Sequence, residues 1–131
     1  MFIIANGNGK VIECINNIFD KTLFEGEYIN GEKNGKEKKF NSYNELIFEG
    51  QYLNGKKHGK IIEYDYSTKY VSEYLNGEKN GYCQEYYNEK LEFEGEYLNG
   101  KRWEGIIYNK EENLEFQIKN GNGKWKKYLM K

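Results

Sequence analysis

The chain has 131 residues, and its 20 Lys and Arg against 21 Asp and Glu leave a formal net charge of −1. This length corresponds to one domain, and the balanced charge excludes a general electrostatic attraction to nucleic acid. The sequence contains no apolar run near the roughly 20 residues that a membrane-spanning helix needs. Tyrosine dominates the aromatic residues, with 13 Tyr against 7 Phe and 2 Trp, and it suits a half-buried surface better than a dry interior.

We interpret the first segment, residues 1–21, as a degenerate capping repeat. It contains Asn6-Gly7-Asn8-Gly9-Lys10, a tighter version of a turn motif that recurs further along the chain. The apolar stretch before it is too short for a secretory signal peptide and has no basic residues in front of it. Cys14 and Cys83 form no CxxC pattern, and nothing requires a disulfide between them. We therefore expect a cytoplasmic protein with reduced thiols.

Four near-copies of one unit occupy about residues 22–108. The clearest begins with Phe48-Glu49-Gly50-Gln51-Tyr52-Leu53-Asn54-Gly55, an alternating strand that ends in Asn-Gly. Asn-Gly tolerates the positive φ that a tight reversal requires, so each unit is predicted to form a β-hairpin. The turn glycines of the four units are Gly31, Gly55, Gly77 and Gly100, which lie 24, 22 and 23 residues apart.

Each return strand is expected to begin after a second glycine, at Lys36, Lys60 and Tyr82 in the first three units. The fourth unit has one extra residue between its two glycines, Gly100 and Gly105. We therefore expect a longer turn there, from which Trp103 projects, and a short return segment over residues 106–108.

A glycine lies between two aromatic residues in three of the outgoing strands, at Gly26, Gly50 and Gly95. Glycine weakens a strand unless something lies close over its backbone. We expect an aromatic ring of a neighbouring strand to cover each of these glycines, which would produce a ladder of rings along the sheet. Because one hairpin is only marginally stable, stacked neighbours must supply most of the stability.

The last segment, residues 109–131, is interpreted as a second capping repeat. Its Asn120-Gly121-Asn122-Gly123-Lys124 matches the motif of the first segment, and residues 116–131 contain no acidic residue. The lysines around Trp125 could contact an anionic membrane surface. A simpler interpretation is a charged cap that keeps the terminal strand soluble, with the protein a monomer or a weak homodimer.

These patterns predict an all-β protein with one domain over residues 1–131. The expected architecture is a single-layer, open, twisted sheet: a solenoid of consecutive antiparallel β-hairpins with about six units of 21–24 residues. The glutamates that alternate with the aromatic positions are expected to form a solvated face of mixed charge on the other side of the sheet.

The repeated unit resembles the MORN repeat family. Its hallmark is an aromatic-x-Gly-x-aromatic strand followed by Gly-Lys-x-x-Gly, which Phe48 to Tyr52 and Gly55-Lys56-Lys57-His58-Gly59 match. The sequence departs from the family at the second glycine of the return strand, where it has Glu37, Ile61, Cys83 and Ile107. The resemblance implies an open sheet of hairpins and a role in interaction or scaffolding, often near membranes. Some relatives self-associate, and bacterial relatives include antitoxin candidates.

Neither the single histidine nor the cysteines indicate a catalytic or metal site. His58 occupies a turn position that Asn34 and Asn80 fill in other units, and no second histidine is available as a ligand or base. Cys83 occupies a strand position that Ile61 fills in the preceding unit. We therefore expect no catalytic residue, no metal and no cofactor.

The favoured function is a non-enzymatic interaction or scaffold module that binds a protein partner through its Tyr-rich surface. The candidate partner-binding residues are Tyr28, Tyr52, Tyr74, Tyr97 and Trp103. Gly26, Gly31, Gly50, Gly55, Gly77, Gly95 and Gly100 are expected to be structural. Two alternatives stay open: a peripheral membrane or phosphoinositide binder, and a small antitoxin-like or immunity-related neutralising binder. No nucleic-acid partner is expected.

Overall fold

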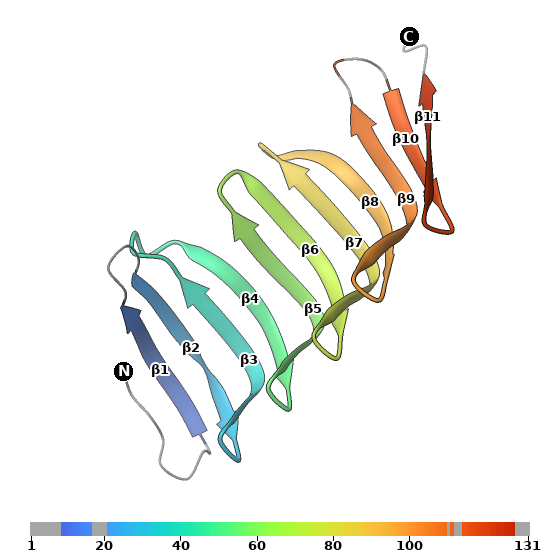
Figure 1. Cartoon of the computed structure of the whole chain (residues 1–131). Coiled ribbons are helices and arrows are strands. Elements are labelled where there is room, and N and C mark those ends of the chain that lie inside the picture. The colour runs from blue at the N-terminus through green and yellow to red at the C-terminus, as the bar shows by residue number, and fades with distance from the viewer. Residues whose placement is uncertain (1–8, 17–20, 110, 112–113, 128–131) are drawn as a thin grey trace.

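The described residues form an open, antiparallel, 11-stranded sheet in which each strand pairs with its neighbours in sequence. The computed structural model describes residues 9–16, 21–109, 111 and 114–127 (Figure 1). The described strands are β1 (Gly9–Asn16), β2 (Lys21–Ile29), β3 (Glu32–Phe40), β4 (Leu46–Leu53), β5 (Lys56–Asp65), β6 (Thr68–Leu75), β7 (Glu78–Tyr87), β8 (Lys90–Leu98), β9 (Lys101–Asn109), β10 (Leu114–Lys119) and β11 (Asn122–Lys127). The predicted all-β, single-layer hairpin sheet is confirmed. The segments interpreted as caps contribute β1, β10 and β11, whereas residues 1–8 lie outside the described residues.

Five Asn-Gly turns connect the strands of the hairpins β2–β3, β4–β5, β6–β7, β8–β9 and β10–β11. In Asn54-Gly55 the φ angles are 50° and 79°, and the other four turns repeat these values within a few degrees. Positive φ at both central residues defines a type I′ turn, whose twist matches that of the flanking strands. The predicted tight turns are confirmed at Gly31, Gly55, Gly77 and Gly100.

The return strands begin earlier than the sequence predicted, directly after the turns at Glu32, Lys56 and Glu78. The second glycine of each unit lies inside the strand with a positive φ, and the ladder is irregular there. In β4–β5, for example, the pairing passes from Glu49–Ile62 to Gln51–His58, so that β5 advances by four residues while β4 advances by two. A positive φ suits a bulge as well as a turn, which is why the sequence alone placed this glycine wrongly.

The fourth hairpin has the same turn as the others, and the prediction of a longer turn was wrong. The pairing of β8 with β9 passes from Glu96–Glu104 to Tyr97–Arg102, which leaves Trp103 as a single extra residue within β9. The return segment is not short either, because β9 has nine residues, as many as β3. The extra residue between Gly100 and Gly105 is thus accommodated in the bulge of β9 and not in the turn.

Successive turns are joined by a repeated hydrogen bond. From the hairpin β4–β5 onward, the turn glycine donates its backbone N–H to a carbonyl in the return strand of the preceding hairpin. These bonds are Gly55 to Lys33 at 2.9 Å, Gly77 to Lys57 at 3.1 Å, Gly100 to Lys79 at 2.9 Å and Gly121 to Trp103 at 2.9 Å. The turns consequently follow one another along one edge of the sheet (Figure 1).

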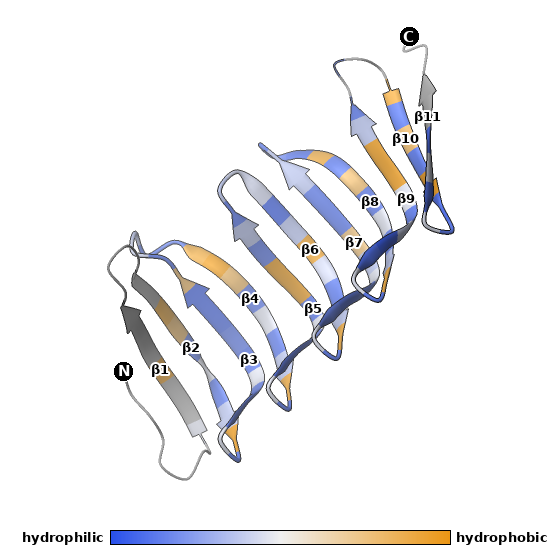
Figure 2. Cartoon of the chain, viewed as in Figure 1, coloured by the Kyte–Doolittle hydropathy of each residue, from blue (hydrophilic) through white to orange (hydrophobic). Residues whose placement is uncertain are grey.

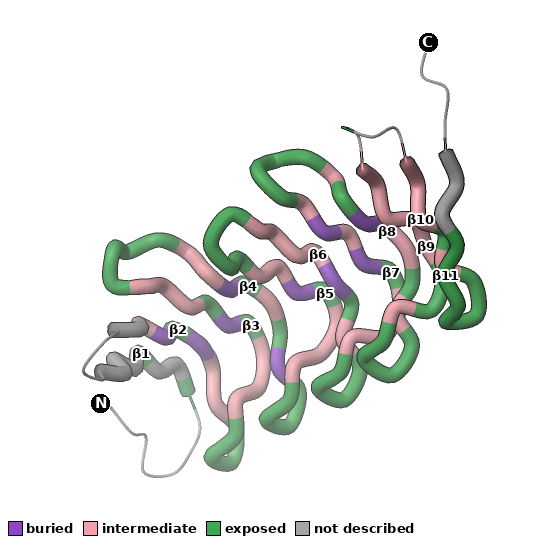
Figure 3. The backbone as a smooth tube through the Cα atoms, turned by 45° about the horizontal axis from the view of Figure 1, so that its top comes forward, coloured by how far each residue is buried: buried purple, intermediate pink, exposed green. Residues whose placement is uncertain are grey.

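The core lies on one face of this single layer, which we call the aromatic face. Phe24, Phe48, Ile61, Cys83 and Phe93 are all buried there, and none is more than 3% exposed. Figure 3 shows most of the buried positions in the middle of the strands, one near the turn end of β4, and exposed positions in the turns and loops. The opposite face carries the exposed residues Glu25, Lys38 and Glu49 in adjacent strands, and we call it the charged face.

The glycines of the outgoing strands are covered mainly by the strand opposite them in the same hairpin. A Cβ added to Gly50 would overlap the side chain of Ile61, and one added to Gly95 would overlap the backbone of Glu104 and Gly105. The predicted cover by rings of neighbouring strands is therefore wrong at these two positions. Close approach of two strands, rather than ring stacking, explains why these positions need glycine.

Candidate partner-binding face

The four candidate tyrosines lie in one row on the aromatic face, close to the turns. A cation lies opposite each tyrosine in the return strand of the same hairpin. We call this set the tyrosine–cation row; its cross-strand pairs are Tyr28–Lys33, Tyr52–Lys57, Tyr74–Lys79 and Tyr97–Arg102. The cations were not among the candidate residues predicted from the sequence, although a Lys or Arg follows each turn glycine at the second position.

The lysines of this row lie between rings of two successive hairpins. The Nζ atom of Lys33 is 4.0 Å from the ring centroid of Phe24 in its own hairpin and 5.3 Å from that of Tyr52 in the next. The Nζ atom of Lys57 likewise lies 5.5 Å from the ring centroid of Phe48 and 5.3 Å from that of Tyr74. The Nζ atom of Lys79 lies 4.4 Å from the ring centroid of Tyr70 and 5.2 Å from that of Tyr97. Since a partly desolvated cation–π contact contributes about 1 kcal/mol, these lysines connect neighbouring hairpins.

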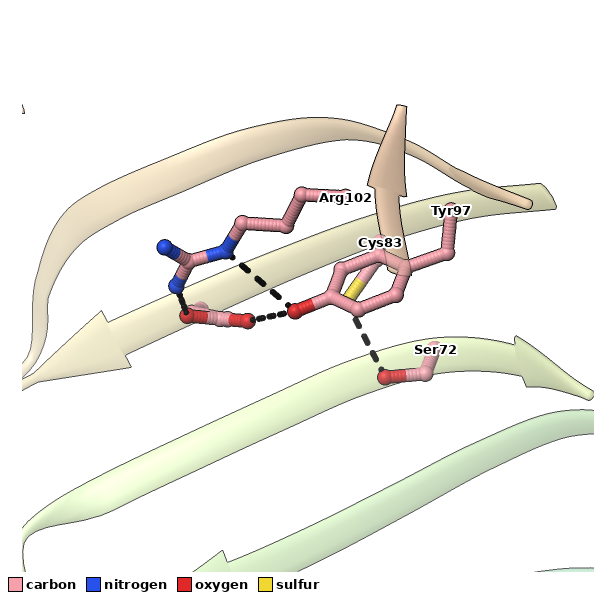
Figure 4. Close-up of polar contacts among 5 residues, drawn as sticks. Ser72, Cys83, Tyr97 and Arg102 are labelled. Atoms are coloured by element: carbon pink, nitrogen blue, oxygen red, sulfur yellow. Dashed lines mark hydrogen bonds and ion pairs between the residues drawn. The ribbon is translucent and has the colours of Figure 1, made fainter. Parts of the chain in front are cut away.

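Two glutamates of the return strands complete the row. Glu63 accepts hydrogen bonds from the Tyr74 hydroxyl at 2.8 Å and from the Lys57 ammonium at 3.2 Å. In the next hairpin the Tyr97 hydroxyl donates to Glu85 at 2.7 Å. Figure 4 shows the Arg102 guanidinium on the other oxygen of the same carboxylate, at 2.5 Å. Each carboxylate therefore has both a phenol and a cation as donors, which offsets the cost of its burial.

The surroundings raise the pKa of three tyrosines of the row, Tyr52, Tyr74 and Tyr97. Burial, followed by the hydrogen bond to Glu85, raises the pKa of Tyr97 to about 12. Burial and the bond to Glu63 raise the pKa of Tyr74 in the same way. Both hydroxyls are therefore protonated donors at neutral pH. Their fixed hydrogen bonds hold the rings in one orientation.

The tyrosines of the row are not equally exposed. Tyr52 is only 9% exposed and packs with Phe48 and Ile61 in the core, whereas Tyr28, Tyr74 and Tyr97 are half-buried. The row therefore serves as part of the core and also reaches the surface through its half-buried members.

Trp103, which the sequence placed with the tyrosines, follows Arg102, the cross-strand partner of Tyr97. Its side chain is 38% exposed, and its ring lies against the Asn120-Gly121 turn of the following hairpin. Figure 4 also shows Cys83 with its thiol 3.1 Å from the Ser72 hydroxyl, deep in the aromatic face. Burial raises the pKa of the Cys83 thiol, so this protonated group packs as a small apolar side chain.

The charged face has a groove of about 640 Å³ that the sequence did not reveal. Ile12 and Ile62 line it together with alternating Glu and Lys side chains such as Glu25, Lys38 and Glu49. It crosses β1 to β5, because the pairing places Glu25 beside Lys38, Lys38 beside Glu49 and Glu49 beside Ile62.

No protein-family model matches the chain, and no curated protein matches it. The MORN resemblance therefore stays a prediction from the motif. Among the described residues, no three His, Cys, Asp or Glu side chains are grouped to hold a metal ion. The same part of the chain has no helix that is long and apolar enough to cross a membrane. Function must consequently be argued from the surfaces of the sheet.

Proposed function

We propose that this protein is a non-enzymatic interaction module, as the MORN resemblance implies, and that it binds another protein along its aromatic face. The observation that carries this proposal is the tyrosine–cation row, which presents a tyrosine opposite a Lys or Arg in four successive hairpins. Tyr and Arg are enriched at the energetic centres of protein interfaces. Rings that are already fixed by hydrogen bonds lose little conformational entropy when a partner binds.

The charges of this face favour a partner segment that carries acidic residues. Of the cations in the row, Lys57 and Arg102 form ion pairs with Glu63 and Glu85. The other two, Lys33 and Lys79, contact rings and are in no ion pair among the described residues. Their positive charge is available to steer an acidic segment toward the exposed edges of the rings.

Affinity capture with matched variants tests this proposal. The bait is the full chain, offered to an extract of its own cells, and captured proteins are identified by mass spectrometry. In the test variant, Lys33→Met and Lys79→Met remove both charges while keeping the apolar stems. The control variant, Lys36→Met and Lys38→Met, removes two exposed lysines of the charged face.

We expect the test variant to lose at least about tenfold of the captured partner and the control variant to retain it. Far-UV circular dichroism must show that both variants keep the sheet. Equal capture by the two variants would contradict binding through the aromatic face. A bait that captures no protein would contradict the proposed function itself.

The membrane-binding and antitoxin-like alternatives are supported by the sequence alone. Residues 128–131 of the basic C-terminal segment lie outside the described residues. Flotation with anionic liposomes tests the first alternative, because a phosphoinositide binder would rise with the vesicles at low salt and a pure protein binder would not.

A further inference from the structure

A second row of side chains runs along the charged face, directly beside the turns. Each hairpin from β2 to β9 contributes one aliphatic residue just before Asn-Gly and one charged residue just after it. We call this the turn-edge row; in spatial order it is Ile29, Glu32, Leu53, Lys56, Leu75, Glu78, Leu98 and Lys101. The two members from each hairpin are cross-strand partners, and all eight are exposed.

The aliphatic members of the turn-edge row form an aligned apolar stripe. Ile29, Leu53, Leu75 and Leu98 are 50%, 46%, 49% and 42% exposed. In Figure 2 hydrophobic colour recurs beside the turns along this edge of the sheet. The hydrogen bonds between successive turns fix their order, and two strand spacings place them roughly 10 Å apart. A stripe of exposed aliphatic residues on a fixed scaffold is typical of a contact surface.

The charged members alternate in sign along the same row. Glu32 is followed by Lys56, then Glu78 and Lys101, and no ion pair of the described residues includes any of the four. Lys56 lies beside the next turn, with its side chain 3.8 Å from where a Cβ on Gly77 would be, as Glu32 lies beside Gly55. The hairpins thus accept either sign at this position, so the fold itself does not require the alternation.

We propose that the turn-edge row recognises a second copy of this chain, and that two copies pair antiparallel about a two-fold axis at Leu75. In this register Glu32 meets Lys101 of the partner subunit, and Lys56 meets the partner's Glu78. Leu75 meets its own symmetry mate, and Leu53 meets the partner's Leu98. Such a self-complementary surface is what a two-fold interface requires.

Other two-fold registers pair fewer of the charges. An antiparallel axis at Leu53 joins only Glu32 with Lys56, and an axis at Leu98 joins only Glu78 with Lys101. A parallel shift by one hairpin also joins opposite charges, but that contact is not two-fold and does not close.

A parallel arrangement in register places each charge opposite its own copy, which is repulsive at all four positions. An antiparallel arrangement with the axis at Lys56 brings Glu32 against Glu78 and Lys56 against itself. The row also ends after Lys101, because the corresponding position before the last turn is Lys119 instead of an aliphatic residue. Among two-fold arrangements, the axis at Leu75 is therefore the one that pairs all four charges.

The pairing should be weak and sensitive to salt. One row of eight side chains buries less than the roughly 1,200 Å² of stable interfaces. A hollow of about 330 Å³ lies beside Leu53 and is lined also by Lys56 and His58. It offers room for the partner's Leu98, which meets Leu53 in the proposed register. We expect a dissociation constant between about 1 μM and 1 mM, and a weaker dimer at high ionic strength.

Sedimentation velocity on the full chain, from about 10 μM to 1 mM, measures the association. The variant E32K/E78K makes all four charges positive, and K56E/K101E makes all four negative. We expect the mean mass of the wild type to rise with concentration from the monomer value toward twice that value, and each variant alone to dimerise at least about tenfold more weakly. An equimolar mixture of the two variants should associate, and the fourfold exchange E32K/K56E/E78K/K101E should restore the wild-type dimer.

The matched control is E25K/E49K, which makes the same charge change at exposed residues of the same face away from the turns. It should dimerise like the wild type. A wild type that stays monomeric throughout, doubly substituted turn-edge variants that dimerise unchanged, or a mixture that fails to associate would each overturn the proposal. The aromatic-face variant K33M/K79M should keep the dimer. Failure of the dimer proposal can therefore be distinguished from failure of the proposed partner binding.

Discussion

At the scale of single residues, the carboxylate of Glu85 shows how a one-layer sheet can bury a charge. The side chain is 12% exposed, and Tyr97 and Arg102 occupy one oxygen each. The sequence could predict that Tyr97 belongs to a row, because its equivalents recur at a constant offset from the turns. It could not predict the hydrogen bond, because the bulges decide which return-strand residue lies within reach of the hydroxyl.

Tyr97 gives a testable dependence of stability on pH. Its pKa rises from 10.0 to about 12 on folding, so the neutral phenol is the form that the folded state favours. The stabilisation is complete below pH 10 and is lost as the pH rises toward about 12. We expect Tyr97→Phe to lower the free energy of unfolding by about 1 kcal/mol at neutral pH. Above pH 10 the free energy of unfolding of this variant should decline less steeply than that of the wild type.

Urea unfolding from pH 8 to 12 measures this effect. The control is Tyr66→Phe, since Tyr66 is fully exposed in a loop. Tyr66→Phe should follow the wild type at every pH. The same alkaline decline in Tyr97→Phe as in the wild type would contradict the assignment of the hydroxyl to Glu85.

At the scale of the hairpin, Gly95 and Gly50 occupy equivalent strand positions but face different neighbours. A Cβ on Gly95 would overlap the Glu104 carbonyl, whereas a Cβ on Gly50 would meet the flexible end of the Ile61 side chain. Backbone cannot yield as a side chain can. We therefore expect Gly95→Ala to lower the free energy of unfolding by about 3 kcal/mol and Gly50→Ala by about 1–2 kcal/mol.

Gly100→Ala serves as the reference for backbone strain alone, because the space beside Gly100 is open and its φ is +81°. Its expected cost is about 1 kcal/mol. Chemical denaturation of the three variants measures the free energy of unfolding that each substitution costs and so ranks them. Equal costs for Gly95→Ala and Gly100→Ala would show that strand proximity is not what requires glycine at position 95.

The hairpins themselves could be predicted from the sequence because two local signals agree. Alternation of aromatic and polar residues indicates a strand, and Asn-Gly indicates a type I′ turn. The bulges could not be placed, since Gly35, Gly59 and Gly81 fit a turn and a bulge equally well. That single ambiguity accounts for both the late return strands and the mistaken turn at Trp103.

At the scale of the whole molecule, each hairpin pairs only with its neighbours in sequence. A defect in one hairpin should therefore spread to its neighbours and fade beyond them. Lys57 is the best position for a test, because it contacts rings of β4 and β6 and pairs with Glu63. Lys57→Met keeps the stem and removes these interactions of the cation.

Amide hydrogen exchange under native conditions resolves this effect strand by strand. We expect Lys57→Met to speed exchange in β4, β5 and β6 by several-fold while β9 and β10 keep their wild-type rates. Lys60→Met, an exposed lysine of the same strand on the charged face, should change none of them. If exchange in Lys57→Met rises equally in all strands, the sheet opens as one unit, and the row of cations couples hairpins over the full length of the molecule instead of pairwise.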